Sequence, residues 1–136
     1  MNKIELKART KKFSIDVIRL IEKLPPSRSL NVLCNQLLRS SSSVASNYRA
    51  ACKGKSTADF LNKIAIVEEE ADESLFWLEL MEESGLVNSK DLTELKKEAN
   101  ELTAIFTAIG RTTKLNQKSN NSEIKQIRNP KSEIRN

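Results

Sequence analysis

The residues that most suggest chemistry lie at positions 53–57, where KGKST matches the last part of a nucleotide-binding phosphate loop. In such a loop the backbone N–H groups and the lysine contact the phosphates. The complete motif also requires a glycine five positions before Gly54 and a strand ahead of the loop. Arg49 occupies that glycine position, and the preceding residues have helical spacing. We therefore do not expect nucleotide hydrolysis.

The same segment is rich in positive charge, which favours a simpler contact with phosphate. A helix is expected to begin just after it, and the backbone N–H groups at a helix start bind anions. Such contacts would act through charge, without reading bases. The alternative is an ordinary solvated corner, in which lysines favour the C-terminal end of a helix. The candidates for nucleic-acid phosphate contacts are Arg39, Arg49, Lys53, Lys55 and Lys63.

Histidine is absent from the chain. This excludes Ser-His-Asp and Cys-His catalysis, His-ligated zinc and the Glu-x-x-His di-iron sites of helical bundles. An acidic run at positions 68–73 raises the question of a metal, but one helix cannot surround an ion and no other segment offers matching carboxylates. We expect no catalytic residue, metal, cofactor or small-molecule substrate, and predict that the protein is not an enzyme.

Two glutamates of the acidic run have a structural explanation. Glu70 and Glu73 flank the apolar seam of their helix, so they are expected to pair with a basic residue of a neighbouring helix or subunit. Arg39 and Arg49 are the candidate partners. These carboxylates are therefore interpreted as structural rather than catalytic.

Length and composition limit the class of protein. The 136 residues fit one domain, and 38% hydrophobic residues with 3 Gly and 3 Pro suit a compact helical fold. No apolar run is long enough to cross a membrane, and the N-terminus lacks the apolar segment of a signal peptide. Cys34 and Cys52 are expected on one helix about 27 Å apart, too far for a disulfide. We expect a cytoplasmic protein with free thiols and no membrane partner.

Charge is unevenly distributed along the chain, whose formal net charge is +5. Residues 1–63 contain 13 Lys/Arg and 4 Asp/Glu, residues 64–101 contain 3 and 12, and residues 102–136 contain 7 and 2. This asymmetry has three interpretations: steering toward phosphate, contact between the basic and acidic faces of two subunits, or simple solvation.

Apolar periodicity predicts an all-α fold, an antiparallel up-and-down four-helix bundle formed by residues 1–115. The four serines at 40–43 are placed inside the second helix, because the heptad phase is the same before and after them. Gly54 is predicted to supply the left-handed residue that ends this helix. Asn47 and Tyr48 are predicted to be polar residues of the interior that fix helix register. The helices are expected at about residues 9–23, 29–53, 57–84 and 89–114.

The end of the third helix carries more apolar residues than one stripe requires. Phe76, Trp77 and Leu80, together with their neighbours, place apolar side chains around nearly the whole circumference. The surplus predicts that another copy of the chain covers this surface, since soluble helical proteins bury such patches in symmetric oligomers. The alternative is that the first helix packs far across it.

Residues 116–136 differ from the rest of the chain. They are polar, their apolar periodicity disappears, and IRN at 127–129 returns at 134–136. We interpret them as a flexible, repeat-derived tail. The basic residues of this tail are candidates for nonspecific contact with RNA, and a passive tail is the alternative.

Three segments together resemble a known family. SVASNYRAA at 43–51, KSTADFLNK at 55–63 and EEADESLFWLEL at 69–80 are similar to the bacterial four-helix-bundle family also called the 23S rRNA-intervening-sequence proteins. The resemblance extends from about residue 13 to 114. It implies a left-handed up-and-down bundle that assembles as a homopentamer. The family is similar to the accessory variability protein of diversity-generating retroelements, a pentamer whose basic surface binds nucleic acid.

One departure from the family pattern concerns Ala50, because the family usually has Glu after its Asn-Tyr-Arg triplet. This change removes a carboxylate beside Arg49, so the polar contact that the family Glu would make is not expected in this chain. The function expected from the sequence is a noncatalytic homo-oligomer that binds rRNA or another nucleic acid through basic surface charge. The rival from another class is a scaffold that binds only protein, either itself or a partner, and an enzyme of unknown type ranks third.

Overall fold

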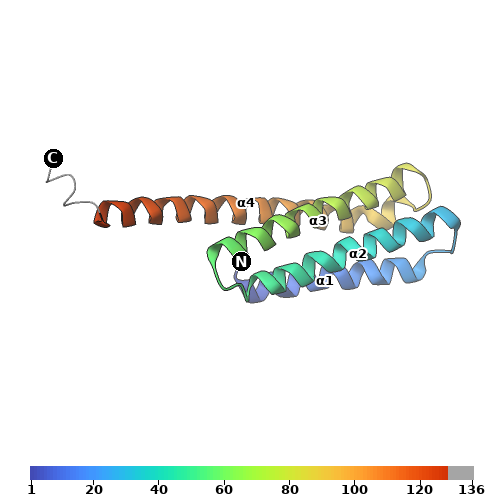
Figure 1. Ribbon diagram of the computed structural model, residues 1–136. Helices are drawn as coiled ribbons and strands as arrows, with labels where there is room; N and C mark the ends of the chain where they lie inside the picture. The colour runs from blue at the N-terminus through green and yellow to red at the C-terminus, as the bar shows by residue number, and fades with distance from the viewer. Residues whose placement is uncertain (129–136) are drawn as a thin grey trace.

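The computed structural model describes residues 1–128, with the side chains of residues 1–123. Within this range the chain forms four helices and no strand. They are α1 (Lys3–Lys23), α2 (Arg28–Ala51), α3 (Thr57–Glu83) and α4 (Ser89–Arg128). Successive helices run in opposite directions, and the last part of α4 projects beyond the other three (Figure 1). No helix in residues 1–128 is long and apolar enough to span a membrane.

The helices pack around one apolar core, which confirms the predicted all-α bundle. Each helix packs against the next in sequence, and α1 also meets α4 to close the bundle. The ring of Tyr48 from α2 lies 5.2 Å from that of Phe106 from α4, centroid to centroid. Tyr48 is therefore an interior residue, as predicted. The largest fully buried side chains include Phe13, Leu37, Ile64, Leu78, Met81, Leu92, Leu102 and Phe106.

The helix boundaries follow local capping signals. Asn2 caps α1: its side chain accepts from the Glu5 N–H at 2.8 Å, and the Glu5 carboxylate accepts from the Asn2 N–H at 3.4 Å. This capping box starts α1 at Lys3, earlier than the expected residue 9, because its two bonds satisfy N–H groups at the helix start. The helix ends at Lys23, ahead of the two prolines, as predicted.

The serine run at 40–43 lies inside α2, as predicted, and it brings the neighbouring helices close. Ser40 and Ser41 are both fully buried. The Ser14 hydroxyl of α1 donates to the Ser41 carbonyl at 2.7 Å. The Ser40 hydroxyl lies 2.8 Å from that of Ser74 in α3. Each short side chain satisfies its hydroxyl while leaving room for another backbone.

The prediction that Gly54 is the left-handed end of α2 is wrong. Within residues 1–128 the glycine with positive φ is Gly85, at 76°, just after α3. The chain leaves α2 instead through tight backbone bonds, with the Gly54 N–H donating to the Ala51 carbonyl at 3.0 Å. A Cβ at Gly54 would itself lie 3.0 Å from that carbonyl oxygen. Gly54 is therefore needed for close approach rather than for its φ.

The predicted end of the fourth helix near residue 114 is also wrong. Residues 116–128 were assigned to a flexible tail, yet they continue α4 as helix. The apolar pattern ends because α4 leaves the other three helices, so this part of α4 has no described helix to pack against (Figure 1). The remainder of the predicted tail, residues 129–136, lies outside the described residues.

Candidate nucleic-acid interface

Three of the predicted phosphate-binding residues surround one surface hollow at the α2–α3 corner. The hollow has a volume of about 390 Å³. Lys53 and Lys55 come from the connection between α2 and α3, and Lys63 comes from the second turn of α3. Its one carboxylate is that of Asp59, so the hollow is lined mainly by positive charge. The other lining residues are Ala50, Gly54, Asn62 and Ile66.

The start of α3 is less open to an anion than the sequence predicts. The Ser56 hydroxyl accepts a hydrogen bond from the Asp59 N–H at 3.1 Å, so this N–H group at the start of α3 is not available to an anion. The Asp59 carboxylate lies in the same hollow and repels a phosphate there. The lysine side chains, rather than the helix start, must therefore supply any attraction for phosphate.

Arg49 lines a separate groove between α1 and α2. Its cationic neighbours there are Lys7 and Lys11 of α1, and the volume of the groove is about 430 Å³. The other side chains that line the groove are small and uncharged, so no carboxylate lines it. The small lining residues are Ala8, Ser14, Ser42, Ala45 and Ser46.

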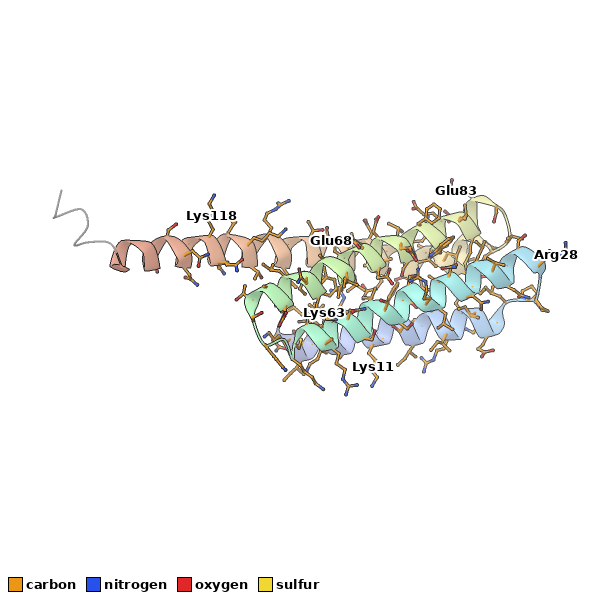
Figure 2. The ribbon with its side chains drawn as sticks, viewed as in Figure 1. Lys11, Arg28, Lys63, Glu68, Glu83 and Lys118 are labelled. Atoms are coloured by element: carbon orange, nitrogen blue, oxygen red, sulfur yellow. The ribbon has the colours of Figure 1, made fainter. Side chains whose placement is uncertain are left out.

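The hollow and the groove belong to the same end of the bundle. The start of α1 lies beside the start of α3, where the Lys3 ammonium is 5.8 Å from the centre of the Phe60 ring. Lys11 and Lys63 lie in the half of the bundle from which α4 projects, and Glu83 lies at the other end (Figure 2). The uneven charge of the sequence thus becomes a basic end of the molecule.

Arg39 is not part of this basic end. Its guanidinium donates to the Glu70 carboxylate at 2.9 Å, pairs with Glu73, and donates to the Gln36 amide oxygen at 3.2 Å. The predicted pairing of Glu70 and Glu73 with a basic residue of a neighbouring helix is confirmed with Arg39. Because two carboxylates neutralise Arg39, its inclusion among the phosphate-binding candidates is not supported by its surroundings. The alternative partner, Arg49, forms no ion pair within the described residues.

Two acidic residues of α3, Glu68 and Glu73, accept further hydrogen bonds that stabilise the fold. Glu68 accepts from the Thr107 hydroxyl of α4 at 2.7 Å. Glu73 additionally accepts from the Trp77 indole N–H at 3.1 Å. Among the described residues, no group of three or more acidic or cysteine side chains is placed to hold a metal ion. Asn47 is half-buried and bonds to Ser43 of its own helix.

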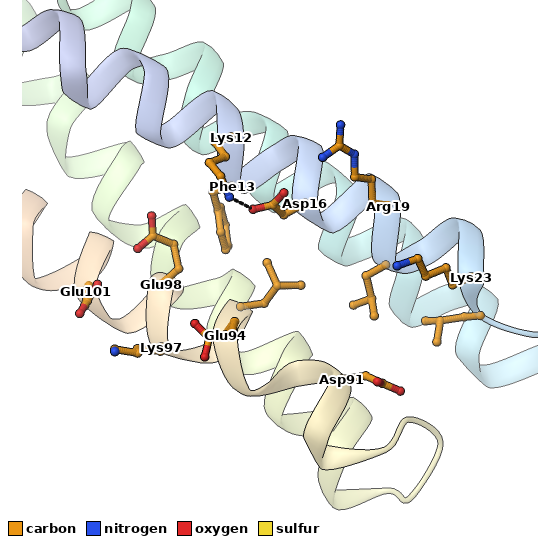
Figure 3. Close-up of a pocket in the computed structure, with 13 residues that line it drawn as sticks. Lys12, Phe13, Asp16, Arg19, Lys23, Asp91, Glu94, Lys97, Glu98 and Glu101 are labelled. Atoms are coloured by element: carbon orange, nitrogen blue, oxygen red, sulfur yellow. Dashed lines mark hydrogen bonds and ion pairs between the residues drawn. The ribbon is translucent and has the colours of Figure 1, made fainter.

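A cleft with a volume of about 630 Å³ separates α1 from α4. Lys12, Arg19 and Lys23 line its α1 side, and carboxylates such as Glu94 and Glu98 line its α4 side (Figure 3). Lys12 pairs with Asp16 at 2.6 Å, so part of this charge is already compensated. The two signs of charge make this cleft a poor surface for a polyanion.

Arg9 of α1 links α1 to α4 beside this cleft. Its guanidinium contacts Glu98 at 2.6 Å and Glu101 at 2.8 Å. The hydrogen bond to Glu98 is the main reason that the pKa of Arg9 is raised. Arg9 is therefore a structural residue, unlike Lys7 and Lys11, which lie near it in sequence.

The outer side of α3 carries the apolar surplus that the sequence predicts. Phe76 is 50% exposed and Leu80 is 37% exposed, whereas Leu78 and Met81 of the same helix are fully buried. Phe76 packs edge-on against Trp77, with 5.0 Å between ring centroids. Within residues 1–128, α1 packs against α2 and α4, and its described contact with α3 is that of Lys3 with Phe60 at the other end of α3, so the alternative in which the first helix covers this surface is wrong.

Comparison with known proteins places this geometry in a family. The family model of the 23S rRNA-intervening sequence protein matches residues 2–108. The chain belongs to this family. One similar solved structure is the crystal structure, at 1.70 Å resolution, of a protein of unknown function from the S23 ribosomal protein family of Bacteroides thetaiotaomicron VPI-5482. It is 28% identical, with a TM-score of 0.71, and the match covers 76% of this chain and 96% of that one. No curated protein matches the chain.

Sequence reasoning missed two cationic residues of the α1–α2 groove. Lys7 was not among the candidates because the first helix was expected to begin near residue 9, and Lys11 was missed because the sequence does not show which face of α1 lies beside Arg49. The signal that could have found Lys7 is the capping pattern Asn2-x-x-Glu5, which starts α1 early enough to place this lysine on it.

Proposed function

We propose that this protein is a noncatalytic homo-oligomer that binds RNA or DNA through the basic end of its bundle. The observation that carries the proposal is the convergence of Lys53, Lys55 and Lys63 on one hollow with a single carboxylate. Arg49 lies in the neighbouring groove and adds to the same field, together with Lys7 and Lys11. Clustered cations raise the local concentration of a polyanion and release its counterions on binding.

The composition of the hollow supports phosphate rather than an ordinary polar ligand. Ala50 lies in it, at the position where the family usually has Glu, so Asp59 remains its one acidic residue. The chain has 6 aromatic residues in all, namely 4 Phe, 1 Tyr and 1 Trp, and none lines the hollow. Base stacking therefore has no partner there, and binding should depend on charge and not on base sequence.

Self-assembly is the second part of the proposal. The exposed Phe76 and Leu80 on α3 support it, because a ridge of this kind is normally buried against another subunit. The expected assembly is a homopentamer, as the family resemblance implies. Repetition of the basic end in each subunit would then strengthen binding to one nucleic acid through multivalency. The buried Cys34 and half-buried Cys52 are free thiols, which suits a cytoplasmic location.

Electrophoretic shift with rRNA fragments and with duplex DNA, each at two salt concentrations, tests the proposal. The subunit number of the same sample is measured by light scattering. We expect affinity to fall steeply with salt, and the triple variant Lys53→Gln, Lys55→Gln, Lys63→Gln should lower the salt slope by about 2 to 3. The matched control is Lys90→Gln with Lys97→Gln, two exposed lysines of α4 near the opposite end. Binding that is undetectable or insensitive to salt would overturn the proposal.

The second candidate function is a scaffold that binds only protein, and the exposed ridge at Phe76 is the observation that favours it. Under this alternative, reversing Lys53 and Lys55 to Glu would change neither assembly nor retention of RNA. Loss of RNA binding in that double variant, with assembly intact, would exclude the scaffold as the whole function.

A further inference from the structure

The end of α4 leaves the bundle and continues alone. Phe106 is the last fully buried residue of α4, and Gly110 still lies near Ile64 of α3. Beyond it, Leu115 is 62% exposed although it is apolar. Residues 111–128 therefore form a helical arm, which projects from the basic end of the molecule (Figure 1). At about 1.5 Å per residue, the arm is about 26 Å long.

The cationic residues of the arm lie along one side of it. Arg111, Lys114 and Lys118 follow one another at steps of three and four residues, and the helix positions of Lys125 and Arg128 follow at steps of seven and three. At about 100° of rotation per residue, these positions fall within a sector of about 100°. Glu123 is the one acidic residue at positions 111–128, and its helix position is on the opposite side.

Nothing in the described structure compensates this stripe of charge. The ion pairs formed within residues 1–123 do not include Arg111, Lys114 or Lys118. Like charges three and four residues apart destabilise a helix, and the Asn, Ser and Thr residues of the arm have low helix propensity. A polyanion along the stripe would relieve the repulsion and stabilise the helix.

We propose that the arm binds the phosphate backbone of duplex DNA. This inference rests on the proposed function and adds a second contact surface to it. Residues 111–128 contain no aromatic side chain, so the arm has no means of stacking on the bases of a single strand. A lone helix about 10 to 12 Å across fits the major groove of B-form DNA, about 12 Å wide, whereas that of an RNA duplex is too narrow.

The arm lies outside the part of the chain that the family match covers. That match ends at residue 108, before the first cation of the stripe.

The test measures binding of the full chain to a duplex DNA of random sequence by fluorescence anisotropy over a range of salt concentrations. The arm variant carries Arg111→Gln, Lys114→Gln and Lys118→Gln, since glutamine keeps helix propensity and removes charge. We expect its dissociation constant to rise at least about tenfold at low salt, and its salt slope to fall by about 2 to 3. The matched control places glutamine on the opposite side of the arm at Thr112, Asn116 and Ser119, and it should bind as the unchanged protein does.

Different outcomes separate the arm from the proposed function. If the unchanged protein binds no nucleic acid, both proposals are overturned. If it binds DNA and the arm variant binds equally well, while the triple variant at Lys53, Lys55 and Lys63 loses affinity, the arm alone is overturned. A loss confined to duplex RNA, to anionic phosphatidylserine vesicles or to subunit number would assign the stripe to another partner and would also overturn the proposal.

Discussion

The hydroxyl of Ser40 in α2 lies 2.8 Å from that of Ser74 in α3, and both side chains are fully buried. Each serine hydroxyl also lies within hydrogen-bond distance of a carbonyl oxygen of its own helix, Ser40 of Leu37 at 3.2 Å and Ser74 of Glu70 at 2.9 Å, so one serine donates to the other hydroxyl while the second donates to its carbonyl. The pair therefore joins two helices without leaving a polar atom unsatisfied. Its small size lets the backbones of α2 and α3 approach each other.

Size, rather than the hydrogen bond, should dominate the effect of substitutions at Ser74. Ser74→Ala is expected to lower the free energy of unfolding by about 1 kcal/mol, because Ser40 keeps its carbonyl partner. Ser74→Leu should cost about 3 kcal/mol or more, because the larger side chain forces the helices apart. Urea denaturation of the two variants measures the difference. Equal losses would show that the interface is not closely packed there.

Arg39→Ala should weaken the bundle slightly and leave nucleic-acid binding unchanged. Arg39 is half exposed, so the loss of its pairs with Glu70 and Glu73 is expected to cost about 1 kcal/mol or less. Arg19→Ala, at an exposed arginine of α1, is the control for general loss of charge. Chemical denaturation and electrophoretic shift measure the two properties. A large fall in affinity for RNA or DNA would show that Arg39 contributes to nucleic-acid binding.

A fall in pH should weaken the ion pair between Glu82 of α3 and Lys96 of α4. Lys96 donates to Glu82 at 2.6 Å, and this bond is the main reason that the pKa of Glu82 is lowered and that of Lys96 is raised. Since the pKa of Glu82 is lower in the folded chain, its contribution is complete at neutral pH and is lost as the pH falls through the folded value.

The contribution of Lys96 is likewise present at neutral pH and is lost as the pH rises through its raised pKa. Glu82→Gln should reduce the loss of stability at acid pH, which is measured by thermal unfolding at a series of pH values. Glu94→Gln, at an exposed glutamate of α4, should leave this loss of stability unchanged. The same loss of stability in Glu82→Gln as in the unchanged protein would contradict the assignment.

Phe76→Glu should reduce the subunit number without unfolding the chain. Phe76 is 50% exposed in one copy, so a charge there is tolerated by the bundle but not by a subunit interface. Light scattering gives the mass, and circular dichroism confirms the helix content. Ile4→Glu is the control, since Ile4 is 76% exposed at the start of α1. Assembly that survives Phe76→Glu would place the interface on another surface.

The two cysteines should differ in their reaction with a thiol reagent. Cys34 is 8% exposed, and burial raises its pKa, so little reactive thiolate is present at neutral pH. Cys52 is half-buried at the end of α2 and should be labelled first. Mass spectrometry of the protein after timed labelling distinguishes the sites, with Cys52→Ser as the reference. Equal rates would indicate that α2 opens frequently near Cys34.

The sequence predicted the parts of the fold that face an interior. The heptad phase on both sides of the serines at 40–43 was enough to keep α2 continuous, because packing overrides the low helix propensity of serine. The pairing of Glu70 with Arg39 followed in the same way from their positions beside the apolar seams. Tyr48 was placed in the core for the same reason.

The failures occurred where no interior imposes a pattern. Apolar periodicity could not predict α4 beyond residue 114, because that part of the helix packs against none of the other helices in residues 1–128. The left-handed glycine was assigned to Gly54 instead of Gly85 because both follow an apolar helix, and composition alone does not separate them. Placing Lys7 in the groove beside Arg49 required the true start of α1, and placing Lys11 there required the packing of α1 against α2.

The open cleft between α1 and α4 has a consequence for the order in which the protein acquires its shape. Apart from the Arg9 contacts, α1 is held mainly by α2 on one side, whereas α2 and α3 each have two closely packed neighbours. Of the four helices, α1 leaves the ribosome before the others, whereas α4, its second neighbour, leaves after them. In the nascent chain α1 therefore packs only against α2 until α4 is synthesised. In the mature bundle α1 should be the first helix to separate during local unfolding.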